Sequence, residues 1–165
     1  MEIERKFLVT DDSYRHLAYA KAEICQGYIC SGHGRTVRIR MRRDIPLSGD
    51  GDVRERAYVT IKGPSDDGGI SRYEWEREIP MDEGIELFKI CESGRVEKTR
   101  WLVQSGKHIV EVDEFHADNE GLVFAEIELA ASDEPYIAPA FLGAEVTGDP
   151  RYYNGYLSKH PYCTW

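Results

Sequence analysis

The chain has 165 residues, a length typical of one domain with a full hydrophobic core. Its 30 acidic and 21 basic residues give a net charge of −9, which argues against a nucleic-acid binder because such proteins need a basic surface. No apolar run is long enough to span a membrane, and the amino terminus is charged from Glu2 onward. We therefore expect a cytoplasmic protein with neither membrane nor nucleic-acid partners.

The dominant signal along the chain is alternation of apolar and polar residues between turn signals, which predicts β-strands. Eight segments show it: 1–8, 24–30, 35–43, 56–63, 71–79, 95–104, 107–115 and 122–130. The joints at 31–34, 64–69, 105–106 and 116–121 resemble hairpin turns, so neighbouring strands should be antiparallel.

The remaining segments predict few helices. A short helix should follow Thr10, a second should cover about 82–92, and a third should run from about 147 to 159, with Asp149-Pro150 at its start. The segment 44–55 is rich in Gly and Asp and predicts a mobile loop. Cys25, Cys30, Cys91 and Cys163 have no metal-ligand spacing, so we expect free thiols and assign them no role.

The first strand carries the pattern Glu2-x-Glu4-x-Lys6. Alternate side chains of a strand share one face, so these three would form a row spaced by about 6.7 Å. Two carboxylates at that spacing can hold a hard divalent cation and leave positions for water and phosphate oxygens. The lysine would then meet the charge of the phosphate.

Similar charged rows occur on the other predicted strands, each opposite an apolar row. For one strand alone, a solvated charged face is the favoured interpretation. Eight antiparallel strands, however, are the size at which a barrel closes around a ligand. The acids are Glu2, Glu4, Glu74, Glu76, Glu78, Glu111, Asp113, Glu126 and Glu128, and the bases are Lys6, Arg38, Arg40, Arg42, Lys62, Arg72, Lys98 and Arg100. Divalent metal and a polyanion would together satisfy these charges if they line the interior.

Six motifs in order resemble the CYTH superfamily, the triphosphate tunnel metalloenzymes. They are the opening Glu-x-Glu-x-Lys, Val37-Arg38-Ile39-Arg40, Thr60-Ile61-Lys62-Gly63, Glu97-Lys98-Thr99-Arg100, Glu111-Val112-Asp113-Glu114-Phe115 and Ala125-Glu126-Ile127-Glu128-Leu129. The tail from Val146 to Asn154 is similar to that of the short bacterial inorganic tripolyphosphatases. The resemblance implies one CYTH domain over 1–165. Its fold would be a closed eight-stranded antiparallel barrel that binds a linear triphosphate with Mg²⁺ or Mn²⁺.

The resemblance also implies roles for individual residues. Glu2, Glu4, Glu126 and Glu128 match metal carboxylates; of Glu111 and Asp113, one would bind metal and the other orient a water, although a salt bridge to a neighbouring arginine is an equal alternative for Glu111. Lys6, Arg38, Arg40, Lys62, Lys98 and Arg100 match the phosphate-binding set. Glu76 is a further site residue, whereas Glu74 and Glu78 would hold basic side chains in place. Arg42 and Arg72 lie near strand ends, where a solvated role is favoured.

The expected reaction is metal-assisted hydrolysis of tripolyphosphate to pyrophosphate and phosphate, without a histidine base. In that interpretation Glu2, Glu4, Lys6, Asp113, Glu126 and Glu128 carry the chemistry. The alternatives are a class IV adenylate cyclase or a nucleoside or thiamine triphosphatase of the same fold, and a non-catalytic polyphosphate-binding module. The carboxyl-terminal helix should lie across one mouth of the barrel near Tyr28 and limit the substrate to a small triphosphate. Oligomeric state stays open, a homodimer included.

Overall fold

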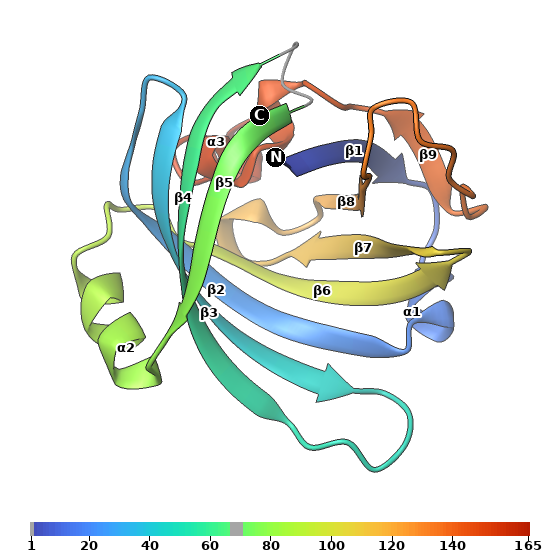
Figure 1. The fold of residues 1–165 in the computed structure, drawn as a ribbon, viewed down its shortest axis with the longest axis horizontal. Coiled ribbons are helices and arrows are strands. Elements are labelled where there is room, and N and C mark those ends of the chain that lie inside the picture. The colour runs from blue at the N-terminus through green and yellow to red at the C-terminus, as the bar shows by residue number, and fades with distance from the viewer. Residues whose placement is uncertain (1, 67–70) are drawn as a thin grey trace.

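The structure is a computed structural model that describes residues 2–66 and 71–165, with only the backbone described at residues 2, 65, 66 and 71. Its main feature is one strongly curved antiparallel sheet (Figure 1). The nine strands are β1 (Glu2–Val9), β2 (Ala20–Gly32), β3 (Arg35–Pro46), β4 (Arg54–Asp66), β5 (Ser71–Ile79), β6 (Val96–Ser105), β7 (His108–Phe115), β8 (Val123–Glu128) and β9 (Leu142–Glu145). Each of the eight predicted strand segments overlaps one of these strands, whereas β9 was not predicted.

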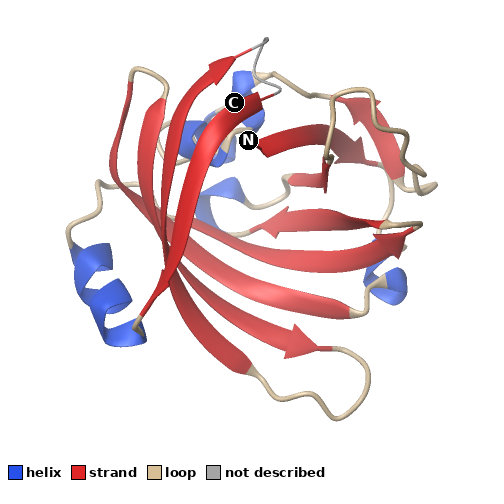
Figure 2. Ribbon diagram, in the orientation of Figure 1, coloured by secondary structure: helices blue, strands red, loops and turns tan. Residues whose placement is uncertain are grey.

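Helices are short, and α1 and α2 lie outside the sheet (Figure 2). They are α1 (Tyr14–Leu17), α2 (Met81–Lys89) and α3 (Asn154–Leu157), with 3-10 turns η2 (Ala117–Asn119), η3 (Pro150–Tyr152) and η4 (Tyr162–Thr164). Within the described ranges, no helix has the length and apolar character needed to cross a membrane.

The strand order is β5-β4-β3-β2-β6-β7-β8-β1-β9, and β5 also contacts β1. One edge of β1 pairs with β8 from Glu4 to Leu8. The other edge is shared: among the described residues β5 pairs with β1 at Glu2 and Ile3, and β9 pairs with it farther along, at Phe7 and Val9. The expected closed eight-stranded barrel is therefore wrong in two respects: the sheet has nine strands, and it is not closed into a barrel. The ninth strand occupies the edge of β1 that closure would require.

Register places the charged rows on the concave side of the sheet. Glu4 stands opposite Glu128 and Lys6 opposite Glu126, while Arg100 stands opposite Asp113. The intervening residues point outward and form an apolar layer under α1 and the 130–141 segment. That layer consists of Phe7, Tyr14, Val103, Val110, Val112, Ala125, Ile127, Leu129 and Phe141.

A second apolar cluster closes one end of the concave side. The same alternating rows that carry Lys98 and Glu126 begin with Val96 and Phe124, which pack with Tyr152 and Leu157 of the carboxyl-terminal segment. This segment is not the single helix that was expected. Tyr153 has an extended conformation between η3 and α3, and there the Tyr152 carbonyl accepts a hydrogen bond from Lys6. The helix is broken where the chain supplies this buried acceptor.

Two predicted connections differ from expectation. The 44–55 loop is shorter, because β3 continues to Pro46 and β4 begins at Arg54. Asp44 stays in the ladder because its carboxylate accepts hydrogen bonds from Arg42 and Arg56. The turn at His33-Gly34 has positive φ at both residues, as a tight hairpin requires. The turn expected at 64–69 lies largely outside the described residues.

Candidate active site

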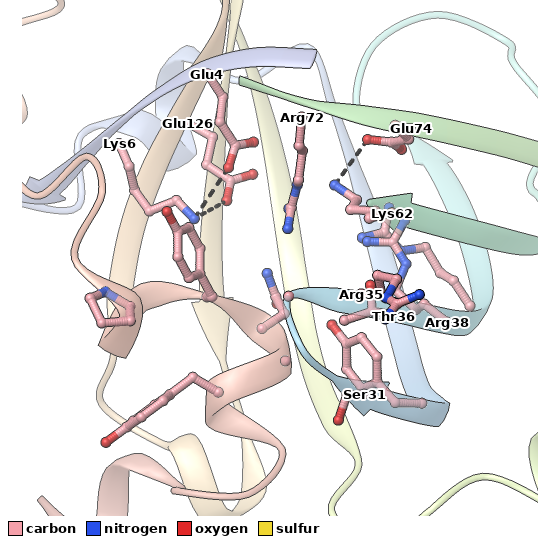
Figure 3. Close-up of a pocket in the computed structure, with 18 of the residues that line it drawn as sticks. Glu4, Lys6, Ser31, Arg35, Thr36, Arg38, Lys62, Arg72, Glu74 and Glu126 are labelled. Carbon is pink, nitrogen blue, oxygen red and sulfur yellow. Dashed lines mark ion pairs between the residues drawn. The ribbon is translucent and has the colours of Figure 1, made fainter. Parts of the chain in front are cut away.

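A cavity of about 660 Å³ occupies the concave side of the sheet. We call its two faces the acidic wall and the basic wall. The acidic wall comprises Glu4, Lys6, Arg100, Glu111, Glu126 and Glu128, from β1, β6, β7 and β8. The basic wall comprises Arg35, Arg38, Arg40, Arg42, Lys62, Arg72, Glu74 and Glu76, from β3, β4 and β5. Figure 3 shows Glu4, Lys6 and Glu126 on one side, Lys62 and Arg38 on the other, and Arg72 between the two groups.

On the acidic wall, two carboxylates converge on one ammonium group. Lys6 Nζ lies 3.0 Å from Glu126 Oε1 and 3.5 Å from Glu4 Oε1 (Figure 3). Burial opposes the charge on Lys6, but Glu126 and Glu4 outweigh it and raise its pKa. Two carboxylates that share one cation at the cavity surface have the spacing and chemistry to share a metal ion as well.

Behind Lys6, a buried network ties Arg100 to three carboxylates. Its guanidinium contacts both oxygens of Asp113 at 2.7 and 2.8 Å, Glu126 at 3.0 Å, and Glu111. Burial opposes ionisation, yet Lys6 and Arg100 hold the pKa of Glu126 well below its usual range. The pKa of Asp113 is also lowered, against the effect of burial, by Arg100 and Lys98.

Asp113 and Lys98 are fully buried beneath this wall and are not among the residues that line the cavity. Lys98 Nζ donates to Asp113 Oδ2 at 2.5 Å and to Asn154 Oδ1 at 3.1 Å. The structure therefore places Lys98 as a link between the network and the carboxyl-terminal segment. Neither residue has the direct contact with the cavity that the expected metal and phosphate roles would use.

The basic wall is held in a different way. Arg38 donates to Thr60 Oγ1 at 3.0 Å and to Glu76 Oε2 at 3.3 Å, and Lys62 is paired with Glu74 at 2.9 Å. The Arg38 Nε atom is buried and has no hydrogen-bond partner among the described residues. An orphaned buried donor of this kind is a place where an anion gains a strong hydrogen bond.

Arg40 lies next to Arg38 and has a neutral partner. Its Nε donates at 2.9 Å to Oε1 of Gln26, whose own amide nitrogen donates to the Tyr28 hydroxyl at 3.3 Å. Burial, together with the charges of Arg38 and Arg100, lowers the pKa of Arg40 to about 9. Burial also raises the pKa of Tyr28. This part of the wall carries positive charge that the protein does not neutralise.

The carboxyl-terminal segment forms the closed end of the cavity. Gly155 packs against Tyr28 and Thr36, so that a Cβ at this glycine would lie 3.8 Å from the Tyr28 ring. The ring of Tyr153 receives Lys6 Nζ at 5.0 Å and the Arg72 guanidinium at 5.8 Å. The segment therefore touches both walls. Its lining residues are Pro150, Tyr153, Asn154, Gly155, Tyr156, Lys159 and His160.

A preformed metal centre is not visible in the described side chains, where no three His, Cys, Asp or Glu residues are grouped as ligands. The side chain of Glu2, an expected ligand, lies outside the described part. The donor set nevertheless fits a hard divalent cation, since Glu4, Glu126 and Glu128 present carboxylate oxygens to the same cavity. Lys6 already shows that two of these groups can converge on one cation.

Most of the predicted site residues line this cavity, including Tyr28, Glu76 and Glu111. Sequence analysis underrated Arg42 and Arg72, which line the cavity although both lie near strand ends. It missed Gln26, Thr60, Arg35, Tyr153, Asn154, Lys159 and His160. Gln26 alternates in phase with the predicted Tyr28, and Thr60 with Lys62, a signal that could have revealed them. The carboxyl-terminal segment was expected at one mouth of the fold near Tyr28, but which of its residues line the cavity was not predicted, because the expected single helix is broken at Tyr153.

These observations define a polyanion and cation site inside a curved antiparallel sheet. A CYTH domain model matches residues 1–153, and the chain belongs to the CYTH family. An inorganic triphosphatase of Acetivibrio thermocellus is 43% identical over 162 residues, covering 98% of this chain and 95% of that protein. An inorganic triphosphatase of Nitrosomonas europaea is 32% identical over 165 residues, covering 95% of this chain and 96% of that protein.

Among solved structures, the inorganic triphosphatase NE1496 has a similar fold, with a TM-score of 0.60 at 27% identity. The match covers 96% of this chain and 94% of that one. The likeness therefore extends through the carboxyl-terminal segment as well as the sheet.

Proposed function

We propose that the protein hydrolyses inorganic tripolyphosphate to pyrophosphate and phosphate with the help of Mg²⁺ or Mn²⁺. The observation that carries the proposal is the facing of the two walls across one cavity. Carboxylates suited to a divalent cation stand on one side. On the other stand two buried guanidinium groups: Arg40 is held by the neutral amide of Gln26, and Arg38 keeps one nitrogen without a hydrogen-bond partner among the described residues. A chain of phosphates with bound metal complements both faces. The names of the two curated relatives support the same substrate.

In this reaction the protein positions the substrate, neutralises the charge of its phosphates and forms no covalent bond with it. Arg38 and Arg40 would bind phosphate oxygens, as would Lys62 and Arg72 from the neighbouring strands. Glu4, Glu126 and Glu128 would hold the metal, and the Glu-x-Glu-x-Lys pattern makes Glu2 a further expected ligand. A bound divalent cation supplies Lewis acidity toward phosphate oxygens and activates the attacking water.

The closed end of the cavity supports an inorganic substrate over one with a bulky organic group. Tyr152 and Leu157 fill that end with apolar packing, and Gly155 lies against Tyr28. A short triphosphate needs no space beyond this point, whereas a nucleoside or thiamine group does.

We place the enzyme in the cytoplasm, an assignment that its four free cysteines support.

Phosphate release from tripolyphosphate, ATP, thiamine triphosphate and pyrophosphate, each with Mg²⁺ or Mn²⁺, tests the proposal. We expect tripolyphosphate to be the best substrate, one phosphate released per turnover, and no activity in excess chelator. Preference for ATP or thiamine triphosphate, or formation of cyclic AMP, would move the function to an alternative of the same fold. If the protein bound tripolyphosphate but did not hydrolyse it with either metal, it would be a non-catalytic binding module.

A further inference from the structure

Gln26 is a fully buried polar residue on the concave face of β2 that is not among the residues lining the cavity. Register places it opposite Arg40 on β3 and opposite Val96 on β6. Both polar atoms of its amide are used, since Oε1 accepts from Arg40 Nε and Nε2 donates to the Tyr28 hydroxyl. A buried amide that is satisfied in this way has a fixed orientation.

The amide of Gln26 is a neutral acceptor, so it orients Arg40 without neutralising its charge. A carboxylate at this place would fix the same guanidinium nitrogen and also neutralise its charge. Arg100 illustrates that case, because Asp113, Glu111 and Glu126 surround it and raise its pKa against the effect of burial. Arg40 forms no ion pair with a carboxylate among the described residues. It is therefore held firmly while its charge stays available.

We propose that Gln26 is a positioning residue for triphosphate binding, which holds Arg40 through a neutral acceptor and so leaves the guanidinium charge for the phosphate chain. The role rests on the proposed function of the cavity. Gln26 acts only through Arg40 and touches neither substrate nor metal.

Because the unpaired charge of Arg40 is buried, the arrangement should oppose stability while it favours binding. A buried charge without a partner is costly, and an anion that enters the cavity relieves the cost. A negative charge added at residue 26 should therefore weaken binding without lowering stability, a separation that a purely structural glutamine would not show.

The main test is Gln26→Glu, which keeps the shape of the side chain and adds one negative charge next to Arg40. Isothermal titration with tripolyphosphate in metal-free buffer should show a dissociation constant about 10-fold to 100-fold higher than that of the wild type. The melting temperature should not fall. The second variant, Gln26→Leu, removes the acceptor, so it should weaken binding and lower the melting temperature together.

Gln104→Glu is the matched control, because it adds the same charge in an exposed hairpin where the side chain contacts Gly106 and His108 carbonyls. It should bind tripolyphosphate like the wild type. Wild-type affinity in folded Gln26→Glu, or in folded Gln26→Leu, would overturn the assignment. Failure of the proposed function would look different, since the wild-type protein itself would then fail to hydrolyse tripolyphosphate with either metal.

Discussion

The acidic and basic walls contain similar numbers of charges but treat them differently. On the acidic wall, Lys6 and Arg100 are ion-paired with the carboxylates, so that much of the charge is compensated before any ligand arrives. On the basic wall, Arg40 has only an amide partner and Arg38 keeps one orphaned nitrogen. The acidic wall is thus organised as a network of ion pairs, whereas the basic wall is organised to attract an anion.

The difference indicates how one cavity can bind two ligands of opposite charge. If all the carboxylates and all the arginines were paired with one another, no charged group in the cavity would be left to bind a ligand. The fold avoids this by placing the two sets on different strands, β1, β7 and β8 against β3, β4 and β5. Lys6 and Arg100 stand among the carboxylates of the acidic wall, and Glu74 and Glu76 stand among the bases of the basic wall.

The largest expected effect comes from the acidic wall. Glu4→Gln removes ligand charge but keeps shape, so hydrolysis of tripolyphosphate should fall by about 100-fold or more. Phosphate release at saturating Mg²⁺ measures it, and addition of excess chelator to the wild type should abolish activity. Glu23→Gln removes the same charge from an exposed pair with Arg43 and should leave activity unchanged. Near-normal turnover by folded Glu4→Gln would exclude the metal-binding role.

The comparison between the walls is sharpest at two buried arginines. Arg100→Met removes the partner that Asp113, Glu111 and Glu126 share and should lower the free energy of unfolding by about 3–5 kcal/mol. Arg40→Met removes an uncompensated charge and should leave stability equal or higher, while affinity for tripolyphosphate falls by roughly 10-fold to 150-fold.

Urea unfolding and titration calorimetry on both variants measure these effects. Arg43→Met, at an exposed position of the same strand as Arg40, is the control for loss of one arginine. A loss of stability in Arg40→Met as large as that in Arg100→Met would show that the two walls are built alike.

The network on the acidic wall predicts a pH dependence of stability. The folded-state pKa values of Glu126 and Asp113 lie below the unfolded values of about 4–4.5. Their ionised forms therefore stabilise the fold above that range, and the contribution is lost as the pH falls through the folded values. The melting temperature should drop steeply below about pH 4. Glu126→Gln should flatten this dependence, and an equally steep curve in that variant would argue against it.

The smallest expected effect concerns the closed end. Tyr156 lines the cavity from the carboxyl-terminal segment but lies outside the apolar cluster that Tyr152 and Leu157 join. Tyr156→Ala should therefore widen this end without unfolding it, and the ratio of ATP to tripolyphosphate hydrolysis should rise several-fold. Tyr73→Ala, which removes an exposed tyrosine from the outer face of β5, should not change the ratio. An unchanged ratio in Tyr156→Ala would leave the segment a structural cover only.

Strand positions and side-chain faces could be predicted from the sequence because both depend on local alternation. The rows that carry Glu4, Lys6, Arg38 and Arg40 have period two, and the period alone assigns them to one face. The six motifs indicated the CYTH family, and the family's fold implied that the charged face points toward the interior of the sheet. Family membership was thus available before any coordinates.

Tertiary structure decided the rest, because it depends on contacts between residues far apart in the chain. β9 carries only four residues and no clear alternation, and it became a strand because the edge of β1 was free to pair. The same long-range packing buried Asp113 and Lys98 behind the wall and brought Arg72 and Tyr153 to the cavity. An arginine is paired either with a neutral acceptor, as Arg40 is with Gln26, or with a carboxylate, as Arg100 is with Asp113. The cross-strand neighbour decides which, and that neighbour is set by the register between strands.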